Sequence, residues 1–298
     1  MKIGVALPQL HIGTDPVVVR DFAQAAEGMG YDHLAAYDHV VGINPSSRPD
    51  WKGLFTSAHA FHDPFALFGF LAGQTKKIGF TTQILILPQR QTVLVARQAA
   101  SVDVLSNGRL RLGVGLGWNP VEFTALGEDF SSRGRRSHEQ IQVLKALWSQ
   151  PNVKFSGEWH ELPDVGLNPL PVQRPIPVWL GGHHDNVRHR IAEVGDGWII
   201  SAYPPDDRAA RGIDHLRQLL RDAGRTEASV GIDAWTSMGS GGPDQWRDEL
   251  SAWRRLGLSH VTLNTGYDGL HHKSISGKSL GDHLDAMRRY HEATVDLL

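Results

Sequence analysis

An aspartate and a histidine stand side by side directly after a short apolar run. Asp38 and His39 follow the run Leu34–Tyr37. An imidazole exchanges a proton near neutral pH, and a neighbouring carboxylate can support it. Neighbours on a strand point to opposite faces, so we expect His39 to face a site and Asp38 to play a supporting part. Plain hydrogen bonding at a strand end is the alternative for the pair taken alone.

A second group of chemically useful residues follows a glycine-punctuated run. The segment Leu110–Gly115 reads as a strand, and Gly117, Trp118 and Glu122 come immediately after it. Barrel enzymes keep their chemistry at the carboxyl ends of strands, where an aromatic ring and a carboxylate would serve. The glycines are equally consistent with a strand packed tightly under a helix, because such a run is weak evidence for a nucleotide site.

A third segment opens a helix with glycines and histidines. Gly181, Gly182, His183 and His184 precede Asn186 at the start of a helical pattern. Free N–H groups at a helix N-terminus attract anions, so a phosphate could bind here. A plain glycine-rich helix start is the alternative.

The histidine pairs do not have the spacing of a metal site. Neither His183 and His184 nor His271 and His272 have a carboxylate or a further histidine at a recognised ligand spacing. The chain contains no cysteine, which excludes disulfides and thiolate chemistry. We therefore expect no metal.

The amino-acid composition limits the classes of partner that we expect for this protein. The 298 residues include 30 Lys and Arg against 32 Asp and Glu, a formal net charge of -2. Such a balance gives no global attraction to nucleic acid or to an anionic membrane. Since no targeting or membrane-spanning run is visible, we expect a cytoplasmic protein whose partners are a small molecule and a second copy of itself.

Strand and helix patterns alternate along the chain. The expected strands are Lys2–Pro8, Leu34–Tyr37, Ile78–Leu87, Leu110–Gly115, Pro177–Gly181, Gly197–Ser201, Val230–Thr236 and His260–Thr265. The expected helices are Val17–Met29, Pro64–Thr75, Val93–Leu105, Ser137–Trp148, Asn186–Val194, Ala209–Ala223, Pro243–Leu256 and Leu280–Leu297. Eight of each predicts an α/β TIM (β/α)8 barrel forming one domain over residues 1–298; an open doubly wound sheet is the alternative.

Two insertions interrupt the alternation, after the second and the fourth strand. The polar stretch Val41–Asp63 is long for a compact domain, and loops of this length usually carry function, so we expect a lid or substrate wall. Residues 152–175 contain a hairpin-like segment, Lys154–His160, followed by a proline-rich return. This second excursion is expected to cover the barrel or to mediate dimer contact.

An ordered series of motifs resembles a known family. The motifs are Tyr37–Val40, Ile86–Arg90, Asp103–Trp118, Glu122, Leu126–Gly127, Val172–Pro175, Trp179–Gly182 and Gly195–Trp198. Together they resemble the bacterial luciferase-like oxidoreductases, and more narrowly the branch that uses the deazaflavin coenzyme F420. The resemblance covers the first two thirds of the chain; the remainder matches only as barrel elements.

The resemblance implies a cofactor ring at the carboxyl-terminal mouth of a barrel, frequently in a homodimer. It implies that His39 handles the substrate proton with Asp38 in support, and that a cis non-proline peptide near Thr82 and Gln83 supports the ring. The residues implied to bind the cofactor are Thr82, Gln83, Gly115, Gly117, Trp118, Glu122, Gly181, Gly182, His183, His184 and Asn186. The anionic tail of the deazaflavin could meet the basic cluster Arg133, Arg135 and Arg136, which a solvated helix start explains equally well.

Two departures from the family pattern bear on the substrate. Ile43 and Trp118 occupy positions where the sugar and alcohol dehydrogenases of the family have tryptophan and glutamate, which argues against alcohol or sugar-phosphate oxidation. Trp51, Phe55, Phe61 and Trp118 would suit an apolar or aromatic substrate.

The resemblance thus predicts an F420-dependent oxidoreductase. The alternatives are an FMN-dependent monooxygenase that needs a reductase partner and oxygen, and a cofactor-binding protein without turnover.

Overall fold

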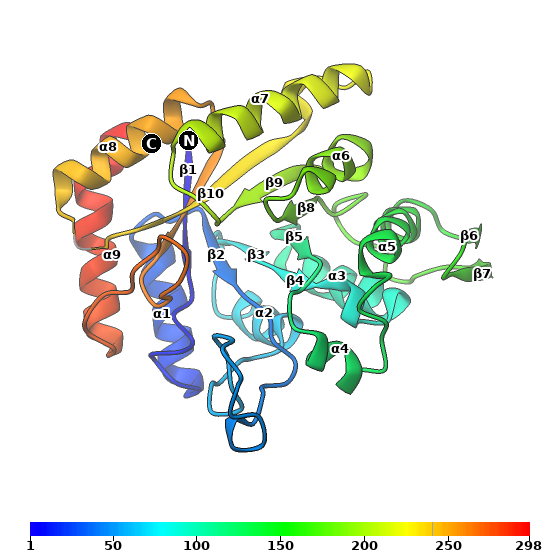
Figure 1. Cartoon of the computed structure of the whole chain (residues 1–298), viewed down its shortest axis with the longest axis horizontal. Helices are drawn as coiled ribbons and strands as arrows, with labels where there is room; N and C mark the ends of the chain where they lie inside the picture. Colours follow the sequence, from blue (N-terminus) through cyan, green and yellow to red (C-terminus); the bar gives the residue numbers. More distant parts are fainter. Residues whose placement is uncertain (240) are drawn as a thin grey trace.

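Parallel strands surround a common axis in the computed structural model, which describes residues 1–239 and 241–298 (Figure 1). The strands of the main sheet are β1 (Lys2–Ala6), β2 (His33–Ala36), β3 (Gly79–Thr82), β4 (Leu85–Ile86), β5 (Leu110–Gly115), β8 (Val178–Gly181), β9 (Gly197–Ile200), β10 (Gly231–Ser237) and β11 (His260–Asn264). Their order is β3-β2-β1-β11-β10-β9-β8-β5-β4, and pairing of β3 with β5 closes the circle. β3 and β4 both pair with β5 and together occupy one strand position of the barrel. The sheet is therefore an eight-stranded barrel, as predicted.

The helices of the barrel lie outside the strands. They are α1 (Pro16–Gly28), α2 (Pro64–Ala72), α3 (Thr92–Ser106), α4 (Pro120–Ala125), α5 (Arg133–Ser149), α6 (Asp185–Val194), α7 (Asp207–Asp222), α8 (Pro243–Arg255) and α9 (Leu280–Thr294). Local hydrogen bonding at the helix ends explains where the helices begin. For α2, the Asp63 side chain accepts the N–H groups of Phe65 and Ala66, and proline occupies the first turn, where no N–H is needed. The short helix α4 was not predicted.

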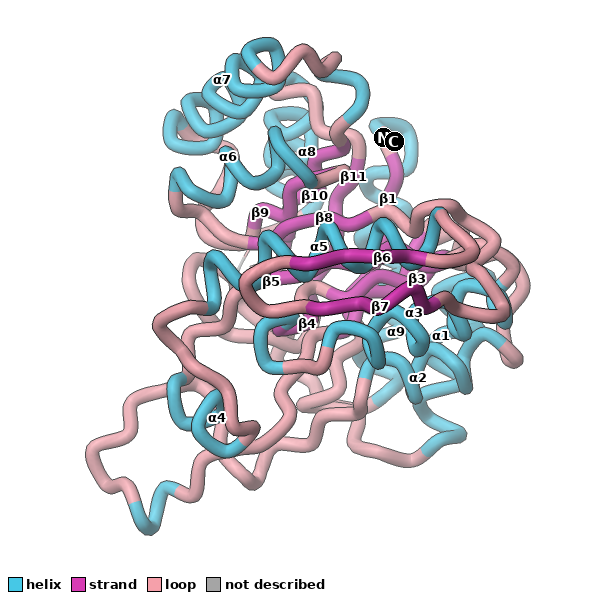
Figure 2. The backbone as a smooth tube through the Cα atoms, turned by 90° about the vertical axis from the view of Figure 1, so that its right-hand side faces the viewer, coloured by secondary structure: helices cyan, strands magenta, loops and turns pink. Residues whose placement is uncertain are grey.

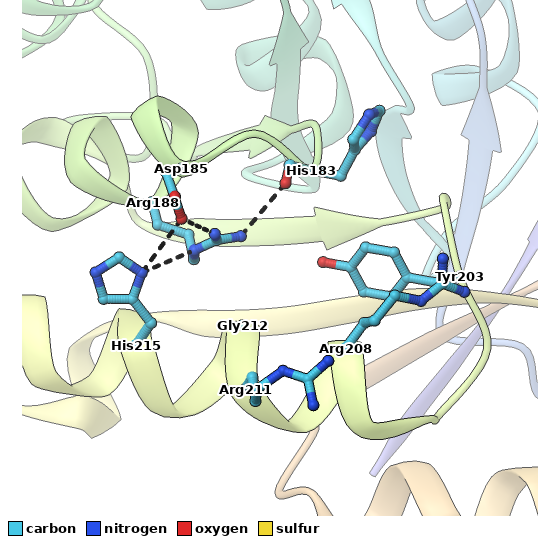
Figure 3. Close-up of a pocket in the computed structure, with 8 residues that line it drawn as sticks. All are labelled: His183, Asp185, Arg188, Tyr203, Arg208, Arg211, Gly212 and His215. Carbon is cyan, nitrogen blue, oxygen red and sulfur yellow. Dashed lines mark hydrogen bonds and ion pairs between the residues drawn. The ribbon is translucent and has the colours of Figure 1, made fainter.

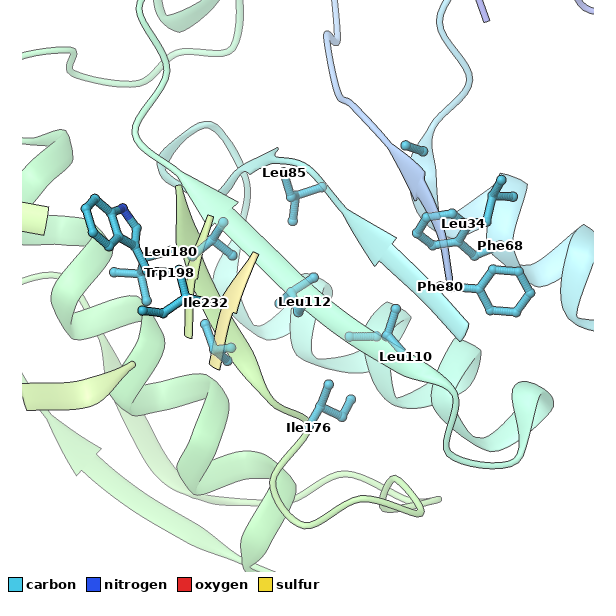
Figure 4. Packing of buried hydrophobic residues seen from close by; sticks show 14 of the residues in the cluster. Leu34, Phe68, Phe80, Leu85, Leu110, Leu112, Ile176, Leu180, Trp198 and Ile232 are labelled. Carbon is cyan, nitrogen blue, oxygen red and sulfur yellow. The ribbon is translucent and has the colours of Figure 1, made fainter. Parts of the chain in front are cut away.

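Side chains along β5 point alternately outward and into the barrel, and this explains the glycine at position 113. Leu110 and Leu112 are fully buried in the layer between barrel and helices (Figure 4). Burying a leucine contributes about 1.5–3 kcal/mol. The intervening residues face the barrel interior, where Arg111 reaches Asp233. A Cβ on the interior-facing Gly113 would lie 2.0 Å from the carbonyl oxygen of Thr82, so only glycine fits there.

A buried carboxylate organises the barrel interior. Asp233 of β10 accepts hydrogen bonds from Arg111 of β5 and from Gln83 at 2.7 Å each, and from Thr262 of β11 at 3.0 Å; His33 of β2 lies 3.5 Å away. Burial alone would raise the pKa of Asp233, but the hydrogen bond from His33 and the charge of Arg111 outweigh it and hold that pKa well below its ordinary range. The carboxylate is therefore ionised and fully compensated.

Both predicted insertions are present. After β2 comes a long loop with one turn of 3-10 helix, Pro45–Ser47. After α5, β6 (Val153–Ser156) and β7 (Glu161–Val165) form an antiparallel hairpin beside α5 on the outside of the barrel (Figure 2). Glu139 of α5 accepts the N–H groups of Glu158 and Trp159, which fixes the turn of the hairpin to that helix.

The third barrel strand differs in detail from the prediction. The expected run Ile78–Leu87 is divided into β3 and β4. A cis non-proline peptide joins Gln83 to Ile84, in the region where one was expected. None of the helices that the structure describes is long and apolar enough to cross a membrane.

The Asp233 network generates a stability prediction. Replacing Asp233 with alanine leaves Arg111 buried without its charge partner, so we expect the variant to lose about 3–5 kcal/mol of unfolding free energy in urea denaturation. Asp214→Ala is the control, because Asp214 is an exposed acid paired with Arg217, and it should cost no more than about 1 kcal/mol.

The difference in unfolding free energy between wild type and Asp233→Ala should depend on pH, and the lowered pKa of Asp233 gives the direction. Because the folded state lowers the pKa of Asp233, its stabilisation is present above the unfolded pKa, about 4, and is lost as the pH falls below it. The difference between wild type and Asp233→Ala should therefore stay constant from pH 6 to about pH 4 and shrink as the pH falls further. A difference independent of pH would contradict an ionised Asp233.

Candidate active site

A cavity of about 450 Å³ lies at the carboxyl-terminal mouth of the barrel. Segments following β2, β5, β8, β9 and β11 line it together with residues of the β3–β4 junction and of β10. The volume is within the range of small-molecule sites, which are mostly apolar with a few placed polar groups.

His39 lines this cavity and is backed by a buried acid. Its Nδ1 lies 3.2 Å from both carboxylate oxygens of Glu122, which is completely buried. Glu122 is held by α4, where the Asn119 side chain caps the helix by accepting the N–H of Val121. A carboxylate only accepts, so Nδ1–H donates to it and the lone pair of a neutral ring is on Nε2. Glu122, expected to bind cofactor, is outside the cavity lining, and its carboxylate lies against the imidazole.

Asp38 supports the site differently from the prediction. Its carboxylate accepts from the Arg90 guanidinium at 2.8 Å and from the N–H of Ile86 at 3.3 Å, and it makes no hydrogen bond to His39. Arg90 also binds Asp63 at 3.0 Å, at the far end of the insertion after β2. Burial raises the pKa of Asp38, and the Arg90 charge opposes that shift. Asp38 therefore fixes the surrounding chain rather than the imidazole.

The insertion after β2 packs aromatic rings onto the imidazole. The ring centroids of Phe55 and Phe61 lie 4.4 and 5.0 Å from that of His39, and Trp118 approaches it edge-on at 6.2 Å. Trp51 stacks on Trp118 at 5.7 Å. Phe55 and Trp118 line the cavity directly, whereas Trp51 and Phe61 stand behind them. The insertion is thus one wall of the site.

Ile84 lines the cavity, and its side chain packs directly against two glycines. A Cβ on Gly115 would lie 2.4 Å from the Ile84 side chain, and one on Gly181 would lie 2.6 Å from it. These glycines therefore make room for Ile84. Gln83 also lines the cavity, with its amide bound to Asp233 and Trp235. Thr82, predicted to bind cofactor, is outside the lining because it is fully buried and donates to the Gly113 carbonyl at 2.6 Å.

The opposite end of the cavity is polar. Gly182, His183 and His184 line it, and Gly182 has φ of +133°, a conformation that favours glycine. The His184 Nδ1 accepts the N–H of Asn186 at 3.3 Å, so this N–H is already occupied. Asn186 does not line the cavity, and only part of the expected helix N-terminus is left for an anion.

The arginines expected to receive an anionic tail do not act together. Arg133 lines the cavity and lies over the Phe130 ring at 3.7 Å. Arg135 is exposed and pairs with Glu158 at 3.2 Å, while Arg136 pairs with Glu128. Consecutive positions on a helix point in different directions, so the cluster in sequence is not a cluster in space.

Several cavity residues were missed, and Tyr37 is the most informative. Its hydroxyl is buried and has no hydrogen-bond partner within the described part of the chain. Rings of Phe55, Phe61, Trp235 and Tyr267 lie 5.9–6.4 Å from the Tyr37 ring. Burial raises the pKa of Tyr37, which keeps the hydroxyl neutral. Tyr37 stands two positions before His39, so the period of a strand could have indicated it.

The paired histidines near the C-terminus are neutral. Burial and the neighbouring His271 lower the pKa of His272 to about 3, and its Nε2 lies 3.0 Å from the Ser201 carbonyl. Across residues 1–239 and 241–298, no group of three or more His, Asp or Glu side chains could hold a metal ion.

Comparison with known sequences gives a family match. The family described as luciferase-like monooxygenase matches residues 1–254. An uncharacterized protein of Mycobacterium tuberculosis is 33% identical over 218 residues, covering 72% of this chain and 75% of that protein. An FMNH2-dependent dimethylsulfone monooxygenase of Pseudomonas fluorescens is 33% identical over 220 residues, covering 72% of this chain and 56% of the enzyme.

Solved structures share the fold at low sequence identity. The monooxygenase RslO1 of Streptomyces bottropensis matches with a TM-score of 0.80 and 18% identity, covering 100% of this chain and 99% of the other. An F420-dependent secondary alcohol dehydrogenase bound to an F420–acetone adduct matches with a TM-score of 0.77 and 17% identity, covering 98% of each chain.

The pair of His39 and Glu122 generates a prediction on stability. Glu122→Ala leaves the buried Nδ1 without an acceptor, so we expect a loss of about 1–3 kcal/mol in unfolding free energy. Glu122→Gln retains an acceptor oxygen and should lose less. Glu158→Ala is the surface control, since its pairing with Arg135 is exposed. If Glu122→Ala were as stable as the control, the pair would not anchor the imidazole.

Proposed function

The chain belongs to the luciferase-like monooxygenase family, and on that premise we propose that it is an oxidoreductase that binds coenzyme F420. The proposed reaction transfers a hydride between the deazaflavin and a small apolar or aromatic substrate. The observation that carries the proposal is the imidazole of His39 on the cavity wall, with its other nitrogen bound to a buried carboxylate.

His39 is proposed to move the proton that accompanies the hydride. In the reducing direction the substrate gains a hydride at one atom and a proton at a second; the imidazolium form of His39 gives that proton from Nε2 and becomes neutral. In the oxidising direction both leave the substrate and Nε2 accepts the proton. Glu122 stabilises the imidazole in either charge state, which is the role of an orienting carboxylate.

The cavity fits a planar ring that carries an anionic chain. Ile84 provides an apolar contact surface, and Gly182, His183 and Arg133 form a polar end where a phosphate could bind. When bound, the deazaflavin would supply a ring carbon that carries hydride. The side chains of Phe55, Trp118, Trp235 and Tyr267 leave an aromatic space for the substrate.

An FMN-dependent monooxygenase is the second candidate. The Pseudomonas fluorescens relative is named as FMNH2-dependent, and the polar end of the cavity suits a single phosphate as well. Such an enzyme needs a reductase partner and oxygen. Binding without turnover is the third possibility, because a fold does not determine an activity.

Cofactor titration separates these candidates. We expect F420 to bind saturably by fluorescence and FMN to bind more weakly. His39→Ala should bind F420 about as tightly as wild type and lose about 100-fold or more in turnover. The control is His138→Ala, a partly exposed histidine paired with Glu193 on the outer helices. Tight FMN binding without F420 binding would reject the F420 proposal, and full activity of His39→Ala would remove the imidazole from the mechanism.

The unpartnered Tyr37 hydroxyl gives an independent test of where substrate or cofactor sits. We expect Tyr37→Phe to be at least as stable as wild type, because no hydrogen bond is lost. Its KM or cofactor Kd should rise about 5- to 10-fold through loss of a hydrogen bond to the ligand. Tyr31→Phe is the matched control, since that hydroxyl donates to the Met287 carbonyl at 2.9 Å and its loss should cost stability without changing affinity. Unchanged KM and Kd in Tyr37→Phe would place both ligands away from this hydroxyl.

A further inference from the structure

A second cavity, of about 530 Å³, opens between α6 and α7 (Figure 3). Arg188 of α6 and Arg208 and Arg211 of α7 line it, with Tyr203 from the segment before α7. None of these residues was singled out by the sequence analysis, and the proposed hydride-transfer chemistry does not use them.

The lining has an excess of positive charge. Three guanidinium groups face one carboxylate, Asp185. Asp185 pairs with Arg188 and lies 3.4 Å from Nδ1 of His215. Arg208 pairs at 2.9 Å with Asp206, which is outside the lining. Arg211 is exposed and has no ion-pair partner within residues 1–239 and 241–298, so its charge is available to a ligand.

The walls of this cleft are fixed by packing. Arg188 is largely buried, lies 5.6 Å from the Trp198 ring and has one amino group 3.4 Å from the carbonyl oxygen of His183. A Cβ on Gly212 would lie 2.9 Å from Trp198 and 3.4 Å from the Tyr203 hydroxyl, so a side chain at this position would crowd the floor. Burial raises the pKa of Tyr203, which leaves its hydroxyl a neutral hydrogen-bond donor.

The cleft adjoins the main cavity through a shared residue. His183 lines both cavities, at the polar end of the one that contains His39. A ligand whose phosphate reaches Gly182 and His183 could therefore continue into the space between α6 and α7. Carboxylates and phosphates are the groups that guanidinium donors bind best.

We propose that the cleft between α6 and α7 binds the carboxylates of the tail of the cofactor, with Arg211 as the principal contact. This assignment rests on the proposed function, because it takes the ligand of the main cavity to be a deazaflavin with an oligoglutamate extension. It replaces the expected site at Arg133, Arg135 and Arg136, because those three arginines do not line one cavity, whereas Arg188, Arg208 and Arg211 do.

The test compares two deazaflavins and two charge reversals. Fluorescence titration measures Kd for F420 and for the deazaflavin riboside phosphate (the riboside), which keeps the phosphate and lacks the tail. In Arg211→Glu, Kd for F420 should rise about fivefold or more and Kd for the riboside should not change. In Arg135→Glu, a reversal on the exposed face of α5, neither Kd should change appreciably. Raising the salt concentration should weaken F420 binding more in wild type than in Arg211→Glu.

The other possible results separate an error in the tail site from an error in the proposed function. Equal effects of Arg211→Glu on both deazaflavins, or no effect on either, would overturn the tail site while leaving the proposed function in place. Failure of wild type to bind either deazaflavin would instead reject the proposed function. Titration with inorganic phosphate separates the two sources of the anion. Suppose that Arg211→Glu weakened the binding of inorganic phosphate, and that wild type bound F420 and the riboside with equal Kd. The cleft would then be a site for free phosphate, and the tail assignment would be wrong.

Discussion

A single buried negative charge governs how the barrel interior is built. Asp233 has no solvent exposure, so its hydrogen-bond donors must come from other residues of the barrel interior, and β5, β11 and the end of β3 each provide one. The donor from the end of β3 is Gln83, whose position fixes that of Ile84 at the cavity surface. The need to compensate one carboxylate thus determines the shape of the space above it.

The candidate site is assembled from pairs of residues that are distant in the chain. His39 depends on an acid more than 80 positions later, at 3.2 Å, and that acid depends on the cap of a short helix. The glycines at the ends of β5 and β8 leave room for the side chain of Ile84, and both also line the cavity. The geometry of the site therefore depends on contacts between segments that are distant in the chain, and no one motif contains it.

The sequence predicts the barrel well because its signal is periodic and repeated. Expected strand and helix ranges agree with the observed ones to within a few residues, apart from the division of the third strand and the missed α4. Residue types and spacing also indicated His39 and the glycine-rich end of β8, which the structure places in the lining of one cavity. They could not assign partners: Asp38 binds Arg90 instead of His39, and Glu122 binds His39. Such pairings depend on side-chain direction after a strand has ended, which local patterns do not encode.

The guanidinium of Arg90 joins the two ends of the insertion after β2, since it binds both Asp38 and Asp63. A loop whose ends are clasped in this way closes at the same place whatever its length, and lengthening it costs little additional entropy. Its interior can therefore accept insertions without moving the barrel, whereas exchanges of Phe55 or Phe61 change the rings that pack on the imidazole. Substitutions in one loop can therefore change the apolar wall of the cavity while Arg90 keeps the two ends of that loop in place.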